Sequence, residues 1–405
     1  MKNLIMIKKT HFLLFFVLIL ASSCHVGRFF VWNFADSKDH KKFQNVDLQN
    51  EGSPFYFTDA SSDNNLKLPV KITRKNKEYE FEDALIKNGT VAFLIIKNDS
   101  ILYEKYFDDY EESTIHPSFS IAKSFVSAII GIAIEDGYIG SVQDPITDYL
   151  PELNKESFGA ITIEHLLDMQ SGIKFNEGYF NPFGHVSKFY YGRNLKKYIG
   201  KLKTETEPGK EWNYISVDAQ LLGLIVENAT QQPLNEYLEK KIWQPLGMEY
   251  DASWSIDSKK NKTVKAFCCL NARARDFAKF GRLYLNNGTW NGKQIISEDW
   301  VTKSTTFDSY KNHVIYSYLW WHNRQSEIVT DSTTLPSVYK ERYSQKKNEE
   351  KQKIIIYPYP DFYARGILGQ FIYVHPKKNM IIVRLGKEYG KTNWGELFKE
   401  IAEMN

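Results

Sequence analysis

Cysteine is scarce in this sequence, and its spacing excludes the common metal-binding patterns. The chain of 405 residues has three cysteines, Cys24, Cys268 and Cys269, and nine scattered histidines. Neither C-x-x-C nor H-E-x-x-H occurs, so we expect no metal site and no cofactor. A disulfide between neighbouring residues closes a strained ring. We therefore expect Cys268 and Cys269 to be two buried thiols.

A net positive charge is lacking outside the N-terminus. The formal net charge of +3 equals the contribution of Lys2, Lys8 and Lys9, because residues 1–23 contain no acidic side chain. The rest of the chain is therefore formally neutral. It has no basic stripe with interleaved aromatic residues, which is the usual footprint of a nucleic-acid-binding surface. We expect no nucleic-acid partner.

No apolar run is long enough to cross a membrane as a mature helix. Phe12 to Ala21 (FLLFFVLILA) is an unbroken run of ten apolar residues behind a lysine-rich start. Ten residues fall well short of the length that spans a bilayer. This pattern predicts that residues 1–23 are a secretory signal peptide.

The end of this leader, Ala21-Ser22-Ser23-Cys24, resembles the lipobox of bacterial lipoproteins. The resemblance implies cleavage before Cys24 and a lipid on that cysteine, whose hydrocarbon chains would anchor the protein to a membrane. The expected location is the cell envelope, and residues 24–70 are interpreted as a lipid-anchored tether and entry segment. An ordinary signal peptide with an incidental cysteine is the alternative.

What the sequence does contain is apolar bulk. Hydrophobic residues make up 42% of the chain and aromatic residues 15%, which is enough for a large core. The aromatic residues fit either a bulky core or an aromatic-lined cleft. Composition alone does not separate these two interpretations.

Strand patterns lie at both ends of the chain, with helix patterns between them. Thr90 to Lys97 and Ser100 to Phe107 form a predicted hairpin around Asn98-Asp99. Two more strands are predicted at 370–375 and 380–385. Helical spacing occurs at 120–140, 162–167, 217–229, 273–288 and 393–404, and Ser297 looks like a further helix cap.

One antiparallel sheet built from the N- and C-terminal segments is the simplest arrangement of these elements. The expected class is α+β, with helices flanking the sheet and a mostly helical domain, about residues 120–300, inserted into a domain spanning 71–405. A cleft should form where the two parts meet. Residues 331–360 are highly charged and are interpreted as a solvated insertion, with a lid over the cleft as the alternative.

The segment FSIAK, residues 119–123, places a serine three residues before a lysine at the start of an apolar helix. Residues i and i+3 share a helix face, and free backbone N–H groups there favour developing negative charge. Desolvation disfavours an ammonium, so a neutral Lys123 amine could take the proton of Ser120. The alternative is that Ser118 or Ser120 caps the helix. The S-x-x-K spacing itself is a weak signal, since it occurs at Ser120/Lys123, Ser171/Lys174, Ser337/Lys340 and Ser344/Lys347.

Two further segments could complete such a site. Tyr214 (EWNYISVDAQ) directly precedes another apolar helix, and a phenol beside a cation can pass a proton to a leaving group. A core tyrosine with a bonded hydroxyl is the alternative. The segment ARGILGQFIYV, residues 364–374, has two glycines before a strand. Such an edge offers backbone N–H groups to an oxyanion, with a β-bulge as the alternative.

In this order, SIAKS (120–124), PGKEWNYIS (208–216) and GILGQFIYVHP (366–376) resemble the motifs of the serine β-lactamase and penicillin-recognising superfamily. The resemblance is greatest to its class C-like branch, which includes esterases, D,D-peptidases and 6-aminohexanoate-dimer hydrolases. Segments 161–173, 242–248 and 272–297 also resemble stretches of that branch. Together these matches cover most of the chain beyond residue 85.

The resemblance implies an acyl-enzyme mechanism on a small ester, amide or peptide-like substrate. Ser120 would attack a carbonyl, with Lys123 as base and Tyr214 as proton relay. Backbone N–H groups of Ser120 and Ile367 would stabilise the oxyanion, and water would release the acid. The resemblance also suggests three substrate-contacting residues, Asn271, Tyr179 and Ser216.

Two departures separate the chain from penicillin recognisers. Tyr214-Ile215-Ser216 stands where Y-x-N is usual, and Ala364-Arg365-Gly366 stands where K-T-G or H-x-G is usual. A strand would turn Arg365 away from the face of residue 364. We therefore expect an amide or ester hydrolase of the 6-aminohexanoate-dimer hydrolase type. The alternatives are a non-catalytic binding lipoprotein, or a D,D-peptidase or β-lactamase; the oligomeric state stays open.

Overall fold

The computed structural model describes residues 25–405 except 33, 63–65, 75–76, 307–315 and 330–352. The expected signal peptide and the expected lipid site at Cys24 lie outside these residues. Within the described ranges, every helix is too short or too polar to cross a membrane.

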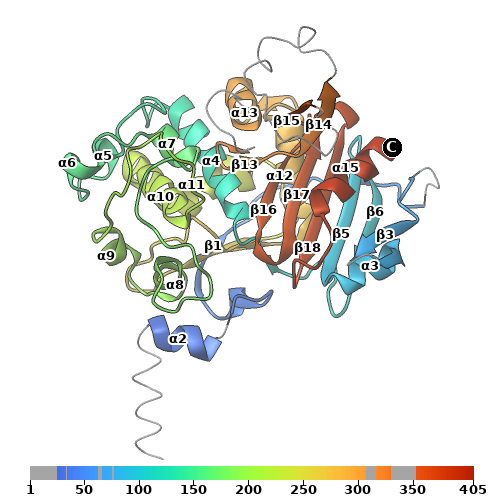
Figure 1. Ribbon diagram of the computed structural model, residues 1–405, viewed down its shortest axis with the longest axis horizontal. Helices are drawn as coiled ribbons and strands as arrows, with labels where there is room; N and C mark the ends of the chain where they lie inside the picture. The colour runs from blue at the N-terminus through green and yellow to red at the C-terminus, as the bar shows by residue number, and fades with distance from the viewer. Residues whose placement is uncertain (1–24, 33, 63–65, 75–76, 307–315, 330–352) are drawn as a thin grey trace, which may run out of the picture.

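An eight-stranded sheet built from both ends of the chain forms the centre of the molecule (Figure 1). Its neighbouring strands are antiparallel except for the parallel β2–β6 pair at one edge. The spatial order is β12 (Tyr316–Ser317), β13 (Trp320–Trp321), β16 (Phe362–Gly366), β17 (Gln370–His375), β18 (Met380–Gly386), β5 (Thr90–Lys97), β6 (Ser100–Tyr106) and β2 (Thr58–Asp59). The predicted hairpin, C-terminal strands and α+β class are confirmed.

Helices cover both faces of this sheet because its strands alternate between two apolar cores. Along β17, Phe371 faces one core and Ile372 the other. The Phe371 side packs on α3 (Phe81–Lys87) and α15 (Trp394–Met404). The Ile372 side packs on α12 (Ala274–Leu285), where a Cβ on Gly281 would come within 2.9 Å of Ile372 Cγ2. Thus α12 belongs to the sheet layer, although the sequence placed it in the helical domain.

The second part of the molecule is mostly helical. Its central helix, α4 (Ile121–Glu135), is apolar on nearly every side and is buried over most of its length, as the sequence predicts. Around it lie α5 (Ile146–Tyr149), α6 (Lys155–Phe158), α7 (Ile163–Leu167), α8 (His185–Tyr191), α9 (Leu195–Ile199), α10 (Ser216–Thr230), α11 (Leu234–Leu238) and the π-helical turn η2 (Glu239–Trp243). Thr162 caps α7 by accepting a hydrogen bond from the backbone of His165.

The N-terminal segment is part of the fold, so its interpretation as a tether is wrong for the described residues. It forms α2 (His25–Trp32), η1 (Asp39–Lys41) and β1 (Gln44–Leu48). Strand β1 is the edge of a second sheet, followed by β8 (Ala252–Ile256), β9 (Leu270–Ala272) and β7 (His116–Pro117). Widely spaced apolar anchors hold the polar segment in place: Phe29, Phe43, Leu48 and Phe57 are all buried.

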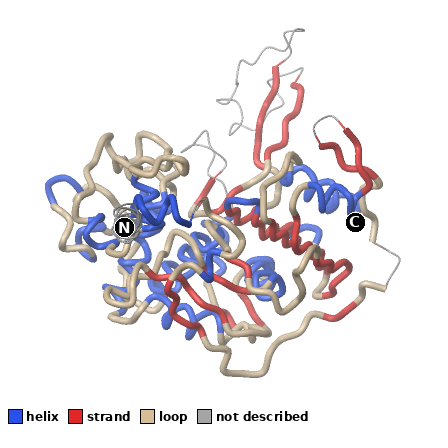
Figure 2. Tube along the Cα trace, turned by 90° about the horizontal axis from the view of Figure 1, so that it is seen from below, coloured by secondary structure: helices blue, strands red, loops and turns tan. Residues whose placement is uncertain are grey.

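The predicted charged insertion is only partly described. Residues 330–352 lie outside the described ranges, whereas β15 (Lys353–Pro358) pairs antiparallel with β14 (Arg324–Val329). These two strands project from the body of the molecule (Figure 2). The remaining elements are the ribbons β3 (Lys71–Arg74) with β4 (Lys77–Glu80) and β10 (Thr289–Trp290) with β11 (Lys293–Gln294), and α13 (Glu298–Thr305), which Ser297 caps.

Candidate active site

Ser120 lies at the N-terminus of α4 but does not cap the helix. Its own backbone is already helical, with φ −68° and ψ −5°, and its side chain makes no capping bond. Ser118 does not cap either, because its Oγ donates to the carbonyl of Phe119. Phe119 is buried with φ 46°, a conformation that is costly for a bulky residue and typical of functional sites. The capping alternative for Ser120 and Ser118 is therefore removed.

Lys123 is buried beside Ser120 instead of extending to solvent. Only 1% of its surface is exposed. Its Nζ donates to Ser120 Oγ at 3.0 Å and to the backbone carbonyl of Phe267 at 2.8 Å. The amine is therefore within the distance that proton transfer from Ser120 requires.

Tyr214 lies against the same amine, just before α10. The centroid of its ring is 5.0 Å from Lys123 Nζ. The ring is fixed by aromatic neighbours, with centroids 6.0 Å from Tyr316 and 5.5 Å from Trp321. The three residues that the sequence nominated for chemistry are thus brought together from two separate segments, the start of α4 and the residues just before α10.

Strand β16 brings the expected oxyanion segment to the start of α4. A Cβ on Gly366 would lie 2.5 Å from the carbonyl oxygen of Ser118, so only glycine allows this approach. The chain then turns at η4 (Ile367–Gly369), where Leu368 has φ 62°. Ile367 and Ser120 line the same cavity, which places their backbone N–H groups on two segments that meet at the nucleophile.

The cavity beside Ser120 has a volume of about 250 Å³ and mostly apolar walls. Its lining residues are Phe34, Ala35, Phe119, Ser120, Tyr179, Phe180, Val186, Ser187, Tyr190, Tyr191, Ser216, Phe267, Cys268, Ile367 and Leu368. The interpretation as an aromatic-lined cleft is supported. Phe34 and Ala35 come from the N-terminal segment, which sequence reasoning did not connect with the site.

Comparison with known proteins agrees with this arrangement. The family model described as Beta-lactamase matches residues 80–391. The chain belongs to the beta-lactamase family. The matched range contains Ser120, Lys123, Tyr214 and Ile367, but it leaves out Phe34 and the rest of the N-terminal segment.

Individual relatives include hydrolases of different names. The 6-aminohexanoate-dimer hydrolase of Paenarthrobacter ureafaciens is 28% identical over 235 residues, which are 55% of this chain and 58% of that protein. Esterase EstB of Burkholderia gladioli is 28% identical over 182 residues, 40% of this chain and 45% of that protein. The matches thus span about half the length of these two curated relatives.

A solved Bacillus anthracis structure named for 6-aminohexanoate-dimer hydrolase superposes with a TM-score of 0.72. The superposition covers 92% of this chain and 93% of that one, at 24% identity. At this identity the likeness shows a shared fold.

Within this beta-lactamase fold, Glu177 organises one wall of the site. It accepts hydrogen bonds from Ser216 N at 2.8 Å, from Ser216 Oγ at 2.6 Å and from Tyr179 Oη at 3.0 Å. Burial and the charge of Glu177 raise the pKa of Tyr179 above its usual range. Tyr179 and Ser216 do line the cavity, but sequence reasoning missed their partner, since Glu177 in FNEGY looked merely solvated.

Asn271 does not contact the cavity, which corrects the expectation of a substrate contact. It is fully buried in β9. Its Nδ2 donates to Asn45 Oδ1 at 3.3 Å and to Ser253 Oγ at 3.2 Å. It therefore ties β1 and β8 to β9 inside the smaller sheet, and its role is structural.

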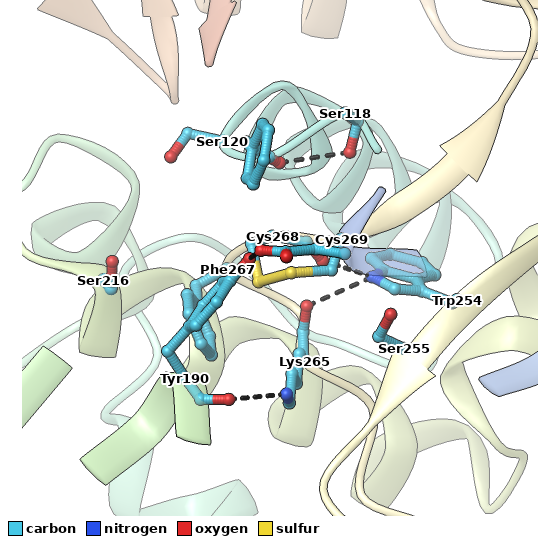
Figure 3. Close-up of a disulfide and its surroundings, with 12 residues drawn as sticks. Ser118, Ser120, Tyr190, Ser216, Trp254, Ser255, Lys265, Phe267, Cys268 and Cys269 are labelled. Carbon is cyan, nitrogen blue, oxygen red and sulfur yellow. Dashed lines mark hydrogen bonds between the residues drawn. A yellow bond between two sulfur atoms is a disulfide. The ribbon is translucent and has the colours of Figure 1, made fainter. Parts of the chain in front are cut away.

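Cys268 and Cys269 form a disulfide, so the expectation of two thiols is wrong (Figure 3). Trp254 holds the backbone of this segment, because its Nε1 donates to the carbonyls of Lys265 at 3.1 Å and Cys268 at 2.7 Å. Burial lowers the pKa of Lys265 well below its usual range. The adjacency of the cysteines was visible in the sequence, but the turn that lets neighbouring sulfurs meet was not.

Arg365 lies over an aromatic ring instead of projecting into the cavity. Its guanidinium carbon is 4.1 Å from the centroid of Trp321. The adjacent Ala364 belongs to the core that faces α4, and the Trp321 ring itself packs 5.5 Å from Tyr214, so the opposition of the two side chains stays a prediction. The charge of Arg365 lowers the pKa of Tyr316, but burial raises this pKa by more, so it lies above its usual value.

Proposed function

We propose that this protein hydrolyses an amide or ester through an acyl-enzyme on Ser120. The observation that carries the proposal is the position of Lys123, whose buried Nζ lies 3.0 Å from Ser120 Oγ at the edge of a cavity. Membership of the beta-lactamase family and the hydrolase and esterase names of its relatives support the same reaction class.

In the first step, Ser120 Oγ attacks the substrate carbonyl carbon and its proton passes to Lys123 Nζ. The Phe267 carbonyl binds the same amine, which fixes the direction from which the amine approaches Ser120. Backbone N–H groups of Ser120 and Ile367 bind the oxyanion, a contribution of about 10²–10³ in rate for one donor.

In the second step, Tyr214 passes the proton from Lys123 to the leaving amine or alcohol. The contact of Lys123 Nζ with the Tyr214 ring, 5.0 Å from its centroid, supports placing both residues in one site. Water then attacks the acyl-enzyme, and Ser120 is restored as the acid departs. The proton of Ser120 thus leaves on the amine or alcohol, and a proton of the attacking water replaces it on Ser120 Oγ.

The proposal places the enzyme in the cell envelope, anchored by a lipid on Cys24. Its support is the sequence pattern of residues 12–24, an apolar run closed by small residues and a cysteine. Hydrolysis of penicillins is disfavoured, because Ser216 bonds Glu177 and Ala364 stands at the usual lysine position. A binding-only role would not require a buried lysine beside Ser120.

A fluorophosphonate probe tests the nucleophile. Intact-mass spectrometry should show one adduct on the wild type, none on Ser120→Ala, and one on Ser171→Ala, which alters the other described S-x-x-K pair. No adduct on folded wild type would refute the proposed activation of Ser120 and favour a binding protein. Labelling by a penicillin at Ser120 would favour the D,D-peptidase or β-lactamase alternative.

A further inference from the structure

Large apolar side chains are exposed at the mouth of the cavity. We call this set the mouth patch, and it consists of Phe30 (68% exposed), Val31 (58%), Phe34 (47%), Phe180 (79%) and Phe183 (69%). They come from two short segments, residues 30–34 and 180–183. Isolated exposed apolar residues are ordinary, but a contiguous group marks a surface that is covered by something.

Ring contacts join three members of the mouth patch, Phe30, Phe34 and Phe180, to the active site. The rings of Phe34 and Phe180 meet edge to face at 5.1 Å, although 146 positions separate them. Buried Phe29 joins the patch from beneath, 5.5 Å from Phe30 and 5.8 Å from Phe34. Phe34 and Phe180 also line the cavity that holds Ser120. A ligand that passes from a surface docked on the patch into the cavity would therefore meet apolar side chains on its way to Ser120.

The position of the patch in the chain argues for a lipid surface as its occupant. Phe30 is only six positions after Cys24, and α2 begins at His25. Because a helix rises about 1.5 Å per residue, Phe30 lies roughly 8 Å along α2 from His25, the residue that follows the proposed lipid site in the sequence. Figure 1 shows α2 at one edge of the molecule, beside α8. An anchored protein therefore holds this face against the membrane.

We propose that the mouth patch docks on the lipid surface and that the cavity takes the single apolar chain of an ester or amide drawn from that surface. This inference rests on the proposed function of Ser120. The cavity of about 250 Å³ is smaller than the ~300–1,000 Å³ of pockets for drug-sized ligands, so one hydrocarbon chain fits it better than a branched or two-chain group. Its walls of aromatic rings, aliphatic side chains and a disulfide suit that chain.

The test uses the full chain in vesicles of phosphatidylethanolamine and phosphatidylglycerol. The variant carries Phe30→Ser, Val31→Ser and Phe183→Ser, none of which lines the cavity. The matched control carries Val70→Ser, Ile86→Ser and Tyr138→Ser, exposed by 74%, 50% and 45% at sites remote in sequence from the patch. Each protein is assayed on p-nitrophenyl dodecanoate embedded in the vesicles and on p-nitrophenyl acetate in water.

The expected result is an about tenfold fall in the dodecanoate rate for the patch variant, with the acetate rate changed less than about twofold. The control variant should match wild type on both esters. In the wild type, kcat/KM on soluble esters should rise at least about tenfold from acetate to octanoate, because the cavity buries the added methylenes.

An unchanged dodecanoate rate would overturn the docking, and a flat chain-length profile would overturn the acyl cavity. If sedimentation in detergent shows a dimer that the patch variant loses while its dodecanoate rate is kept, a second copy covers the patch and the inference is overturned. Absence of turnover together with absence of a phosphonate adduct on Ser120 would instead refute the proposed function on which it rests.

A separate observation concerns the disulfide. The carbonyl that binds Lys123 Nζ belongs to Phe267, directly before Cys268 and Cys269. Trp254 fixes the carbonyls on both sides of Phe267, those of Lys265 and Cys268, and Figure 3 shows the disulfide between Phe267 and Trp254. The geometry points to the disulfide as a positioning element for the amine of Lys123. Cys268 also lines the cavity, so a small dithiol can reach it.

Reduction by a dithiol would transfer two electrons and two protons to the sulfurs, giving two thiols and a cyclic disulfide of the reagent. The freed turn no longer fixes the Phe267 carbonyl, so the alignment of Lys123 with Ser120 is lost. We expect kcat on the soluble ester to fall about tenfold, with KM changed less than about twofold. The pH dependence of kcat should move as well, and reoxidation should restore it.

The double variant Cys268→Ser with Cys269→Ser is the matched control. It should resemble the reduced wild type in kcat and pH profile and should not respond to the dithiol. A purely structural role would lower the unfolding midpoint without moving the pH profile. Unchanged kcat and pH profile in wild type whose thiols titrate as reduced, or in the folded double variant, would overturn this inference.

Discussion

Two segments of this protein carry the same S-x-x-K spacing and make opposite uses of it. Lys123 is 1% exposed and its Nζ donates to Ser120. Lys174 is exposed and pairs on the surface with Glu205 at 2.6 Å. Ser171 turns the other way, and its Oγ donates to Asp218 at 2.7 Å. Only the first pair shares a hydrogen bond between its own members.

The backbone accounts for this difference. Residues 120 and 123 stand at the start of α4, where positions three apart share a face. Between Ser171 and Lys174 the chain is irregular, and Gly172 has φ 69°, which breaks the helical relation. A short motif thus acquires its chemistry from the element that carries it.

The largest difference between the two segments should be seen at the serines. Ser120→Ala removes the nucleophile and should lower kcat by about 10⁴-fold or more. Ser171→Ala should leave kcat within about threefold but destabilise the fold by about 1–3 kcal/mol, because buried Asp218 loses its donor. Single-turnover kinetics and urea unfolding measure the two effects. Equal turnover by Ser120→Ala and wild type would contradict the assigned nucleophile.

Removal of the buried amine should have the next largest effect. Lys123→Met keeps the length of the side chain but leaves Ser120 without a base, so kcat should fall by about 10²–10⁴-fold. Circular dichroism should show an unchanged fold, since α4 is apolar around this position. A folded Lys123→Met enzyme with wild-type kcat would show that another group takes the proton.

The Ser171 segment should affect the pH dependence of the unfolding free energy and not the rate of catalysis. Burial raises the pKa of Asp218 well above its usual value of 3.8. The folded state therefore keeps a proton that the unfolded chain has already lost. The stabilising contribution of the protonated carboxyl is complete below about pH 4 and is lost as pH rises through the folded pKa.

Asp218→Asn cannot ionise and keeps an oxygen that can accept from Ser171. Its free energy of unfolding relative to wild type should therefore improve steadily from pH 4 to pH 8. Urea titrations at several pH values measure this difference. A relative stability that is constant with pH would show that Asp218 ionises in the folded state as it does in the unfolded chain.

The smallest effect belongs to the surface lysine. Lys174 and Glu205 are more than half exposed, and such pairs contribute about 0–1 kcal/mol. Lys174→Met should change the unfolding free energy by less than about 0.5 kcal/mol and leave kcat unchanged. A large loss of activity in Lys174→Met would mean that the Ser171/Lys174 segment takes part in the reaction, and would contradict the difference proposed between the two segments.

The sequence predicted those features that depend on local pattern. The apolar run after Ser120 predicted α4. The β-rich run from Thr90 to Lys97 and the alternation from Ser100 to Phe107 predicted the β5–β6 hairpin. Context in the sequence also selected Ser120/Lys123 among four equal spacings. These features are local because helix and hairpin patterns repeat within a few residues.

The features that sequence reasoning missed depend on contacts between distant segments. Phe34 reaches the cavity only because α2 packs beside α8, and Glu177 matters only because the backbone of Ser216 arrives next to it. Asn271 looked available to substrate, yet its strand lies between β8 and β7, and its side chain bonds Asn45 of β1. None of these contacts can be predicted from the residues that flank Phe34, Glu177 or Asn271 in the sequence.

The pairing of β18 with β5 affects how the protein folds during its synthesis. Met380 of β18 lies opposite Lys97 of β5, and β18 also separates β5 from β17. The central sheet therefore stays open during synthesis until β18 has emerged, 283 positions after Lys97, and contacts this distant along the chain form slowly. Until the sheet closes, the nascent chain can still be extended. On the proposal that residues 1–23 direct export, delayed closure of the sheet would let the polypeptide pass through a narrow translocation channel before it acquires its final shape.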